Sequence, residues 1–169
     1  MIARPAALAG MFYPAEPAML KRTVAELCAA APAPGNGAKV IIAPHAGYPY
    51  SGLTAAHAYR QLEARRDLIR RVVLLGPTHR VYLKGMAVPS VDAFTTPLGD
   101  VLIDADGIRQ AQEVPAVQVS DEAHANEHSL EVHLPFLQTV LDDFLLIPIA
   151  VGVCTARHVE ALLDALWGG

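Results

Sequence analysis

Apolar residues recur along this chain in two patterns, continuous runs that are typical of buried strands and three-to-four-residue spacings that are typical of helices. The runs predict three long strands, at residues 40–43, 71–75 and 144–151. Shorter apolar stretches predict strands at 85–89, 101–103 and 114–119. The helical spacing predicts helices over residues 15–30, 53–66, 104–112, 127–137 and 155–167. Strands that alternate with helices indicate an α/β fold in three layers, with a mostly parallel central sheet and helices on both faces.

Length and composition limit the classes of protein that this chain can represent. With 169 residues, of which 53% are hydrophobic and 18% charged, we expect one globular domain over residues 1–169. A net charge of −4 and a pI near 5.9 argue against a nucleic-acid partner. No apolar run reaches the length of a transmembrane helix, and prolines interrupt the first 14 residues, so we expect neither a membrane anchor nor a signal peptide. The two cysteines, Cys28 and Cys154, form no C-x-x-C motif, which favours the reducing cytoplasm.

Two of the predicted long strands end in a loop that contains a histidine. His45 follows the strand at 40–43 within the sequence PHAGYPY, and His79 follows the strand at 71–75 within GPTH. Neighbouring parallel strands would bring these loops together at one edge of the sheet, where ligands bind in open α/β folds. Because imidazole is the commonest metal ligand, the pair predicts half of a metal site. The alternative is that His45 only hydrogen-bonds to the backbone of a tight strand-to-helix connection.

The densest polar cluster of the sequence is the segment EHSLEVH, within the last predicted helix but one. It does not match the zinc-protease motif H-E-x-x-H, because His128 and His133 lie about 140° apart around a helix. Glu127 and Glu131 instead lie side by side on one helical face, next to an apolar stripe. They form either a solvent-exposed acidic start of the helix or a pair with a role in the site. If His128 faces the site, it is a candidate general base or a hydrogen-bond donor to a residue of the site. Pro135 predicts a kink or a restart of the helix.

Five motifs, in this order, resemble those of the Memo-like proteins. They are AGMFYP at 9–14, APHAGYPYSG at 43–52, LGPTH at 75–79, SVD at 90–92 and EHSLEVHLPF at 127–136. Memo-like proteins form component B of the AmmeMemoRadiSam group and are related in fold to the class III extradiol dioxygenases (LigB-like). The resemblance covers nearly the whole chain, and it implies the α/β fold of those enzymes.

The resemblance also implies a metal site and the residues around it. His45 and His79 match two ligands, for Fe(II) or Cu. His128 and Glu127 lie nearby on the predicted helix and are the expected catalytic residues. The aromatic residues expected to wall the substrate pocket are Phe12, Tyr48 and Tyr50.

The third ligand that the resemblance implies has no match in this sequence. In Memo-like proteins it is a cysteine far toward the C-terminus, and Cys154 matches neither its motif nor its position. We therefore expect the chain to be an N-terminal portion of the family's domain, with a fold that is incomplete at its C-terminus. The alternatives are that the chain binds metal weakly through two imidazoles or binds none. Apolar edges that the rest of the domain would cover favour self-association.

Two classes of function follow from the resemblance. The first is a metal-dependent redox enzyme, similar to a dioxygenase, that acts on an unknown small molecule and has a functional link to a radical-SAM protein of the same group. The second is a non-enzymatic module that binds a peptide or a small ligand in an aromatic-walled cleft, as the link of eukaryotic Memo-like proteins to signalling implies. A zinc hydrolase is a weaker third interpretation, because the ligand spacing of zinc hydrolase motifs is missing.

Overall fold

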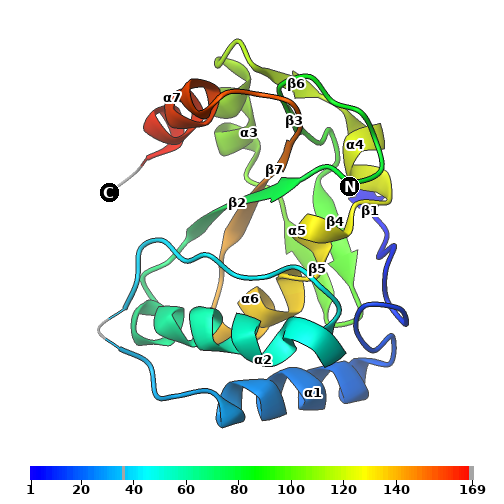
Figure 1. The fold of residues 1–169 in the computed structure, drawn as a ribbon, viewed down its shortest axis with the longest axis vertical. Helices are drawn as coiled ribbons and strands as arrows, with labels where there is room; N and C mark the ends of the chain where they lie inside the picture. Colours follow the sequence, from blue (N-terminus) through cyan, green and yellow to red (C-terminus); the bar gives the residue numbers. More distant parts are fainter. Residues whose placement is uncertain (36, 168–169) are drawn as a thin grey trace.

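The computed structural model describes residues 1–35 and 37–167, and it contains two mixed sheets flanked by helices (Figure 1). The larger sheet has four strands, in the order β2 (Arg71–Pro77), β7 (Leu145–Val151), β3 (Met86–Val88) and β6 (Val117–Val119). Its β2–β7 and β3–β6 pairs are parallel, whereas β3 and β7 are antiparallel. The smaller sheet has the order β1 (Ala3–Arg4), β4 (Ala93–Thr96) and β5 (Gly99–Leu102), and combines a parallel with an antiparallel pair. The α/β class is therefore confirmed, but a single, mostly parallel sheet is not.

Helices cover both faces of the larger sheet, as the apolar pattern of its strands predicts (Figure 1). The first core lies on the side of α1 (Pro17–Ala30), α2 (Tyr48–Tyr59) and α6 (Leu134–Val140). The second core lies on the side of α3 (Ala105–Gln112) and α7 (Ala156–Leu166). Along β7, Leu146 belongs to the first core, whereas Ile147 and Ile149 belong to the second, which explains why this strand is apolar at successive positions. The shorter helices are a 3-10 helix (Arg60–Arg65), α4 (Asp121–Ala125) and α5 (His128–Glu131).

The strand predicted at residues 40–43 is wrong, because this segment is an extended connection that leads into α2. Ile41 and Ala43 pack partly against the first core. Val40 and Ile42, which alternate with them, are 64% and 94% exposed. A strand needs a neighbour that completes its hydrogen bonds, and none of the described strands pairs with this segment. A local apolar run does not reveal whether such a neighbour is present.

The single helix predicted over 127–137 is two helices in the structure. α5 ends at Glu131 and α6 begins at Leu134, with Val132 and His133 between them. Pro135 lies in the first turn of α6, where its missing N–H costs no hydrogen bond, so the restart predicted at this proline is confirmed. The predicted apolar stripe is buried at all four positions, Leu130, Leu134, Leu137 and Leu141.

Other predicted elements are present with shifted ends. α2 begins earlier than the predicted helix at 53–66, because Pro49 suits a first helical turn, and the last part of that range is the 3-10 helix. β6 covers only the end of the strand predicted at 114–119. Asn36, Gly168 and Gly169 of the expected domain lie outside the described residues. Within the part of the chain that is described, no helix combines the length and the apolar content needed to cross a lipid bilayer.

Candidate metal centre

Three histidines from separate segments meet at one place. His45 lies in the connection before α2, His79 in the loop after β2, and His128 is the first residue of α5. Each offers a ligand nitrogen, and these atoms all lie within 4.8 Å of one another. The ring centroids are 4.5 Å apart for His79 and His128, 5.2 Å for His45 and His79, and 5.7 Å for His45 and His128. The structure thus brings together the two histidines predicted to share a site and adds a third.

Backbone hydrogen bonds hold the two histidine-bearing loops in place. The Thr78 amide donates at 2.9 Å to the last carbonyl of β7, which ties the His79 loop to that strand. The Tyr48 amide donates to the Phe12 carbonyl at 2.8 Å, which ties the His45 segment to the N-terminal loop. The two loops therefore meet, although the reason expected from the sequence, two adjacent parallel strands, is wrong.

A buried carboxylate orients His79. Glu127 is 2% exposed and accepts hydrogen bonds from the His79 amide at 2.6 Å, from His79 Nδ1 at 2.9 Å and from the Ser129 amide at 2.9 Å. Burial by itself raises the pKa of Glu127, but these hydrogen bonds outweigh it and lower the pKa to about 2. Because the carboxylate is ionised, Nδ1 carries the proton and Nε2 keeps a free lone pair, as is usual in metal-binding histidines. The solvent-exposed interpretation of the acidic pair is therefore wrong for Glu127.

His128 packs between His79 and Phe12. Its ring stacks on that of His79 at an interplanar angle of 25°, and the Phe12 ring centroid is 4.7 Å away. Its Nδ1 is buried and has no hydrogen-bond partner among the described residues, although it lies 3.3 Å from Glu127 Oε1. Burial lowers the pKa of His128, against the opposing charge of Glu127, and burial also lowers the pKa of His45. The neutral imidazole, which is the form that binds metals, is therefore favoured at both positions.

This set of donors fits a metal ion. Three nitrogens that each lie about 2.0–2.1 Å from one tetrahedral ion are about 3.4 Å apart, so nitrogens that now lie within 4.8 Å of one another would move inward by up to about 1.4 Å to share an ion. Imidazole ligands suit Fe, Cu or Zn.

The other predicted site residues lie at different depths. Phe12 packs on His128, whereas Tyr48 is buried in the first core and its hydroxyl donates at 2.8 Å to the backbone carbonyl that follows α5. Tyr50 is 89% exposed. Cys154 follows β7 and packs against the second core, apart from the histidine cluster. The pocket-wall role of the three aromatic residues stays a prediction.

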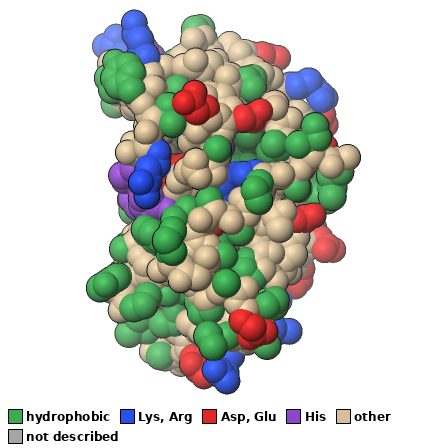
Figure 2. All heavy atoms as spheres, turned by 90° about the vertical axis from the view of Figure 1, so that its right-hand side faces the viewer, with side chains coloured by type: hydrophobic (Ala, Val, Ile, Leu, Met, Phe, Trp, Pro, Cys, Tyr) green, Lys and Arg blue, Asp and Glu red, His purple; other side chains and the backbone are tan. Residues whose placement is uncertain are grey.

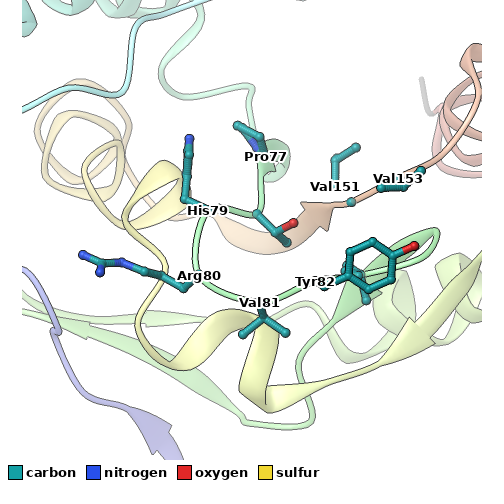
Figure 3. Close-up of a pocket in the computed structure, with 10 residues that line it drawn as sticks. Pro77, His79, Arg80, Val81, Tyr82, Val151 and Val153 are labelled. Atoms are coloured by element: carbon teal, nitrogen blue, oxygen red, sulfur yellow. The ribbon is translucent and has the colours of Figure 1, made fainter.

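A surface hollow of about 460 Å³ borders the cluster at His79 (Figure 3). The loop after β2 supplies most of its lining, including Arg80, Val81 and Tyr82, and the end of β7 supplies the rest. In Figure 3, His79 and Arg80 lie at one end of this loop and Tyr82 at the other. Arg80 and Tyr82 are not among the site residues predicted from the sequence. Their closeness to His79 along the chain is the signal that points to them.

Comparison with known proteins finds relatives over most of the chain. A family model described as Memo-like protein matches residues 4–166. A MEMO1 family protein of Aquifex aeolicus is 41% identical over 152 residues, which are 89% of this chain and 55% of that protein. A MEMO1 family protein of Methanothermobacter thermautotrophicus is 38% identical over 162 residues, and the match covers 89% of this chain and 57% of that protein. Protein MEMO1 of Homo sapiens is 36% identical over 157 residues, and the match covers 90% of this chain and 52% of that protein.

The match to the family model includes the whole histidine cluster. The matched range, 4–166, contains His45, His79 and His128 together with the N-terminal loop that packs on them. The chain spans just over half the length of the relatives that it matches. Because the family model matches nearly all of its residues, the chain belongs to the Memo-like protein family.

Proposed function

We propose that the three histidines bind an iron or copper ion and that the protein catalyses a redox reaction, similar to that of a dioxygenase, on a small molecule. The observation that carries this proposal is the convergence of three imidazole nitrogens within 4.8 Å of one another, with an ionised carboxylate behind them. The related fold of the extradiol dioxygenases supports it. A bound ion of either metal would supply open coordination positions and a change of oxidation state.

His45 and His79 are the ligands expected from the sequence, and we assign His128 as the third. This assignment is supported by its ring, which lies against that of His79, and by its ligand nitrogen, which lies within 4.8 Å of those of His45 and His79. It replaces the general-base role expected for His128 from the sequence. Glu127 has a pKa of about 2, so it stays ionised at neutral pH and acts by holding the proton of His79 on Nδ1.

The surroundings of the cluster favour an acidic small molecule that also has an apolar part. Arg80 borders the hollow and forms no ion pair with any described carboxylate. Figure 2 shows a positively charged side chain directly beside the histidines, on the left margin of that view. Val81 and Tyr82 supply apolar surface in the same hollow. Phe12 packs on the ring of His128, which limits the access of water to that ligand.

The alternative function is a module that binds a peptide or a small ligand without catalysis. Two exposed tyrosines, Tyr50 and Tyr82, favour this alternative, because tyrosine is enriched in recognition surfaces. Tyr82 lines the same hollow as His79, at the other end of the loop (Figure 3). Unlike an enzyme, such a module would keep its affinity for the ligand when the metal is removed.

Oxygen uptake by the metal-loaded protein separates these two functions. The protein is prepared without air, loaded with Fe(II) or Cu(I), and mixed with oxygen and a panel of catechols and aromatic carboxylates. We expect oxygen uptake that depends on the added compound and that is lost in His79→Ala. A phosphotyrosine peptide that binds equally to the loaded, metal-free and His79→Ala proteins, without oxygen uptake, would favour the binding module instead.

A cytoplasmic location and a link to a radical-SAM protein are further parts of this proposal. Cys28 and Cys154 are both free thiols, in keeping with a reducing compartment. Co-purification of the tagged chain with a radical-SAM protein from its own cells tests the link. Repeated recovery of the tagged chain without such a protein would count against it.

A further inference from the structure

A second buried carboxylate lies behind the histidine cluster. Glu131 is 0% exposed, and its Oε2 accepts hydrogen bonds from Arg4 Nη1 at 2.6 Å and from the Ala7 amide at 2.9 Å. Its Oε1 accepts from the Leu8 amide at 2.8 Å and from the Tyr13 hydroxyl at 2.6 Å. Four donors fill the four lone-pair sites of one carboxylate. Glu131 therefore fastens the N-terminal loop, residues 7–13, to α5.

Arg4, the ion-pair partner of Glu131, also holds the backbone in front of His128. Its Nη2 donates to the Glu127 carbonyl at 2.9 Å, and its Nε donates to the His124 carbonyl at 2.6 Å. The Glu127 carbonyl belongs to the peptide bond that leads into His128. The guanidinium group therefore fixes the turn that presents both the orienting carboxylate and the third histidine.

The N-terminal loop reaches two of the three histidines. The ring of Phe12 packs on His128, with a centroid distance of 4.7 Å. The carbonyl of Phe12 accepts a hydrogen bond from the Tyr48 amide at 2.8 Å, at the start of the helix that follows His45. A displacement of this loop would move the wall over His128 and the anchor of the His45 segment together.

We infer that Glu131 is a positioning residue for the histidine cluster. It holds the N-terminal loop against α5, and through Arg4 it fixes the backbone that presents Glu127 and His128. This inference rests on the proposed metal-binding function. The two acidic residues of the motif thus have separate roles: Glu127 orients a ligand directly, and Glu131 positions the backbone segments that carry the ligands.

The metal affinity of Glu131→Gln in the full chain tests this inference. Glutamine keeps the size of the side chain but places an NH2 group against donors such as the Arg4 guanidinium or the Tyr13 hydroxyl. We expect Co(II) and Cu(II) to bind about 10–100-fold more weakly, the loss usual when a group that supports metal ligands is removed. We also expect a changed Co(II) absorption spectrum and Cu(II) EPR spectrum. A merely structural role would leave both spectra of the bound ion unchanged.

Asp104→Asn is the matched control. Asp104 is also a buried carboxylate paired with an arginine, Arg71, at 2.5 Å. Arg71 begins β2, whereas His79 follows the other end of that strand, so the control lies far from the cluster. Asp104→Asn should lower stability and leave the metal affinity and both spectra unchanged. Equal losses of affinity in the two variants would overturn the inference, as would wild-type affinity and spectra in a folded Glu131→Gln protein.

Two further measurements decide the remaining outcomes. If the unmodified protein binds no metal, the proposed function fails, and imidazole NMR resonances of the metal-free protein decide the inference alone. Shifts of His45 and His128 in Glu131→Gln but not in Asp104→Asn would support it, and unshifted resonances would overturn it. If Glu131→Gln does not fold, Tyr13→Phe removes only one of the four donors, and a several-fold loss of affinity is then expected. An unchanged affinity in Tyr13→Phe would overturn the inference.

Discussion

Replacement of Glu127 by glutamine should weaken metal binding without changing the size of the side chain. The two carboxylate oxygens accept hydrogen bonds from the His79 amide, from His79 Nδ1 and from the Ser129 amide. An amide has one oxygen and one NH2 group, so either orientation sets the NH2 group against at least one of these donors. The His79 ring then loses its fixed orientation or the partner of its Nδ1.

The pKa of Glu127 indicates the size of this effect. Despite burial, hydrogen bonds lower the pKa from an ordinary value of 4.5 to about 2. A shift of this size corresponds to about 3 kcal/mol before solvent screening is allowed for. Loss of one buried hydrogen-bond partner lowers the free energy of unfolding by about 1–3 kcal/mol. Loss of a group that orients a metal ligand weakens metal affinity about 10–100-fold. We expect a folded, less stable variant with a metal affinity lowered by that factor.

A competition titration of Co(II) or Zn(II) against a coloured chelator, without air and at neutral pH, measures this affinity. Urea denaturation of the same samples measures the free energy of unfolding. Glu160→Gln removes the same charge from an exposed position on α7 and should change neither quantity appreciably. A folded Glu127→Gln protein with unchanged metal affinity would refute the orienting role of Glu127.

Three further predictions concern stability and association. Burial lowers the pKa of His124 and of His133 to about 4, whereas both titrate near 6.5 in the unfolded chain. The unfolded chain therefore binds more protons between these values, and the free energy of unfolding should fall as the pH decreases from about 6.5 to about 4, by on the order of 3 kcal/mol for each histidine. Urea denaturation at a series of pH values measures this fall. A flat profile over this range would contradict the buried, neutral state of these rings. Gly76→Ala would place a Cβ 2.7 Å from Ser129 Oγ, so the free energy of unfolding should fall by about 1–3 kcal/mol. Thermal denaturation measures this loss. An unchanged midpoint would contradict it and would mean that the neighbouring side chains move to make room. Ile42 is exposed and no described strand covers the outer edge of β2, and both features favour self-association. Sedimentation velocity should show species larger than a monomer, and Ile42→Asp should reduce their amount. A monomer at all concentrations would refute this prediction.

The long strands β2 and β7 could be predicted because each is covered on both faces and is therefore apolar at successive positions. The segment at 40–43 is as apolar as these strands but is not a strand. Strand formation requires a neighbouring strand, and the local apolar pattern does not show whether one is present. The antiparallel pairing of β3 with β7 could not be predicted either, because it depends on how two segments far apart in the chain approach each other.

Part of the candidate site could be predicted from the sequence: its histidines, but not the roles of its two glutamates. His45 and His79 could be singled out because each follows an apolar run and lies in a loop rich in glycine and proline. Helical geometry alone left the roles of Glu127 and Glu131 open, since the partners of both lie far away in the sequence. Arg4, for example, precedes Glu131 by 127 residues, and no local pattern joins the two.

The metal content of four proteins tests the central claim most directly. The unmodified chain and its His45→Ala, His79→Ala and His128→Ala variants are loaded without air with Fe(II) or Cu(I), desalted and analysed for metal per protein chain. A three-histidine site predicts about one ion per unmodified chain and a strong loss in each variant, His128→Ala included. Full metal content in His128→Ala would contradict the role of the third ligand, and the absence of metal from the unmodified chain would contradict the site as a whole.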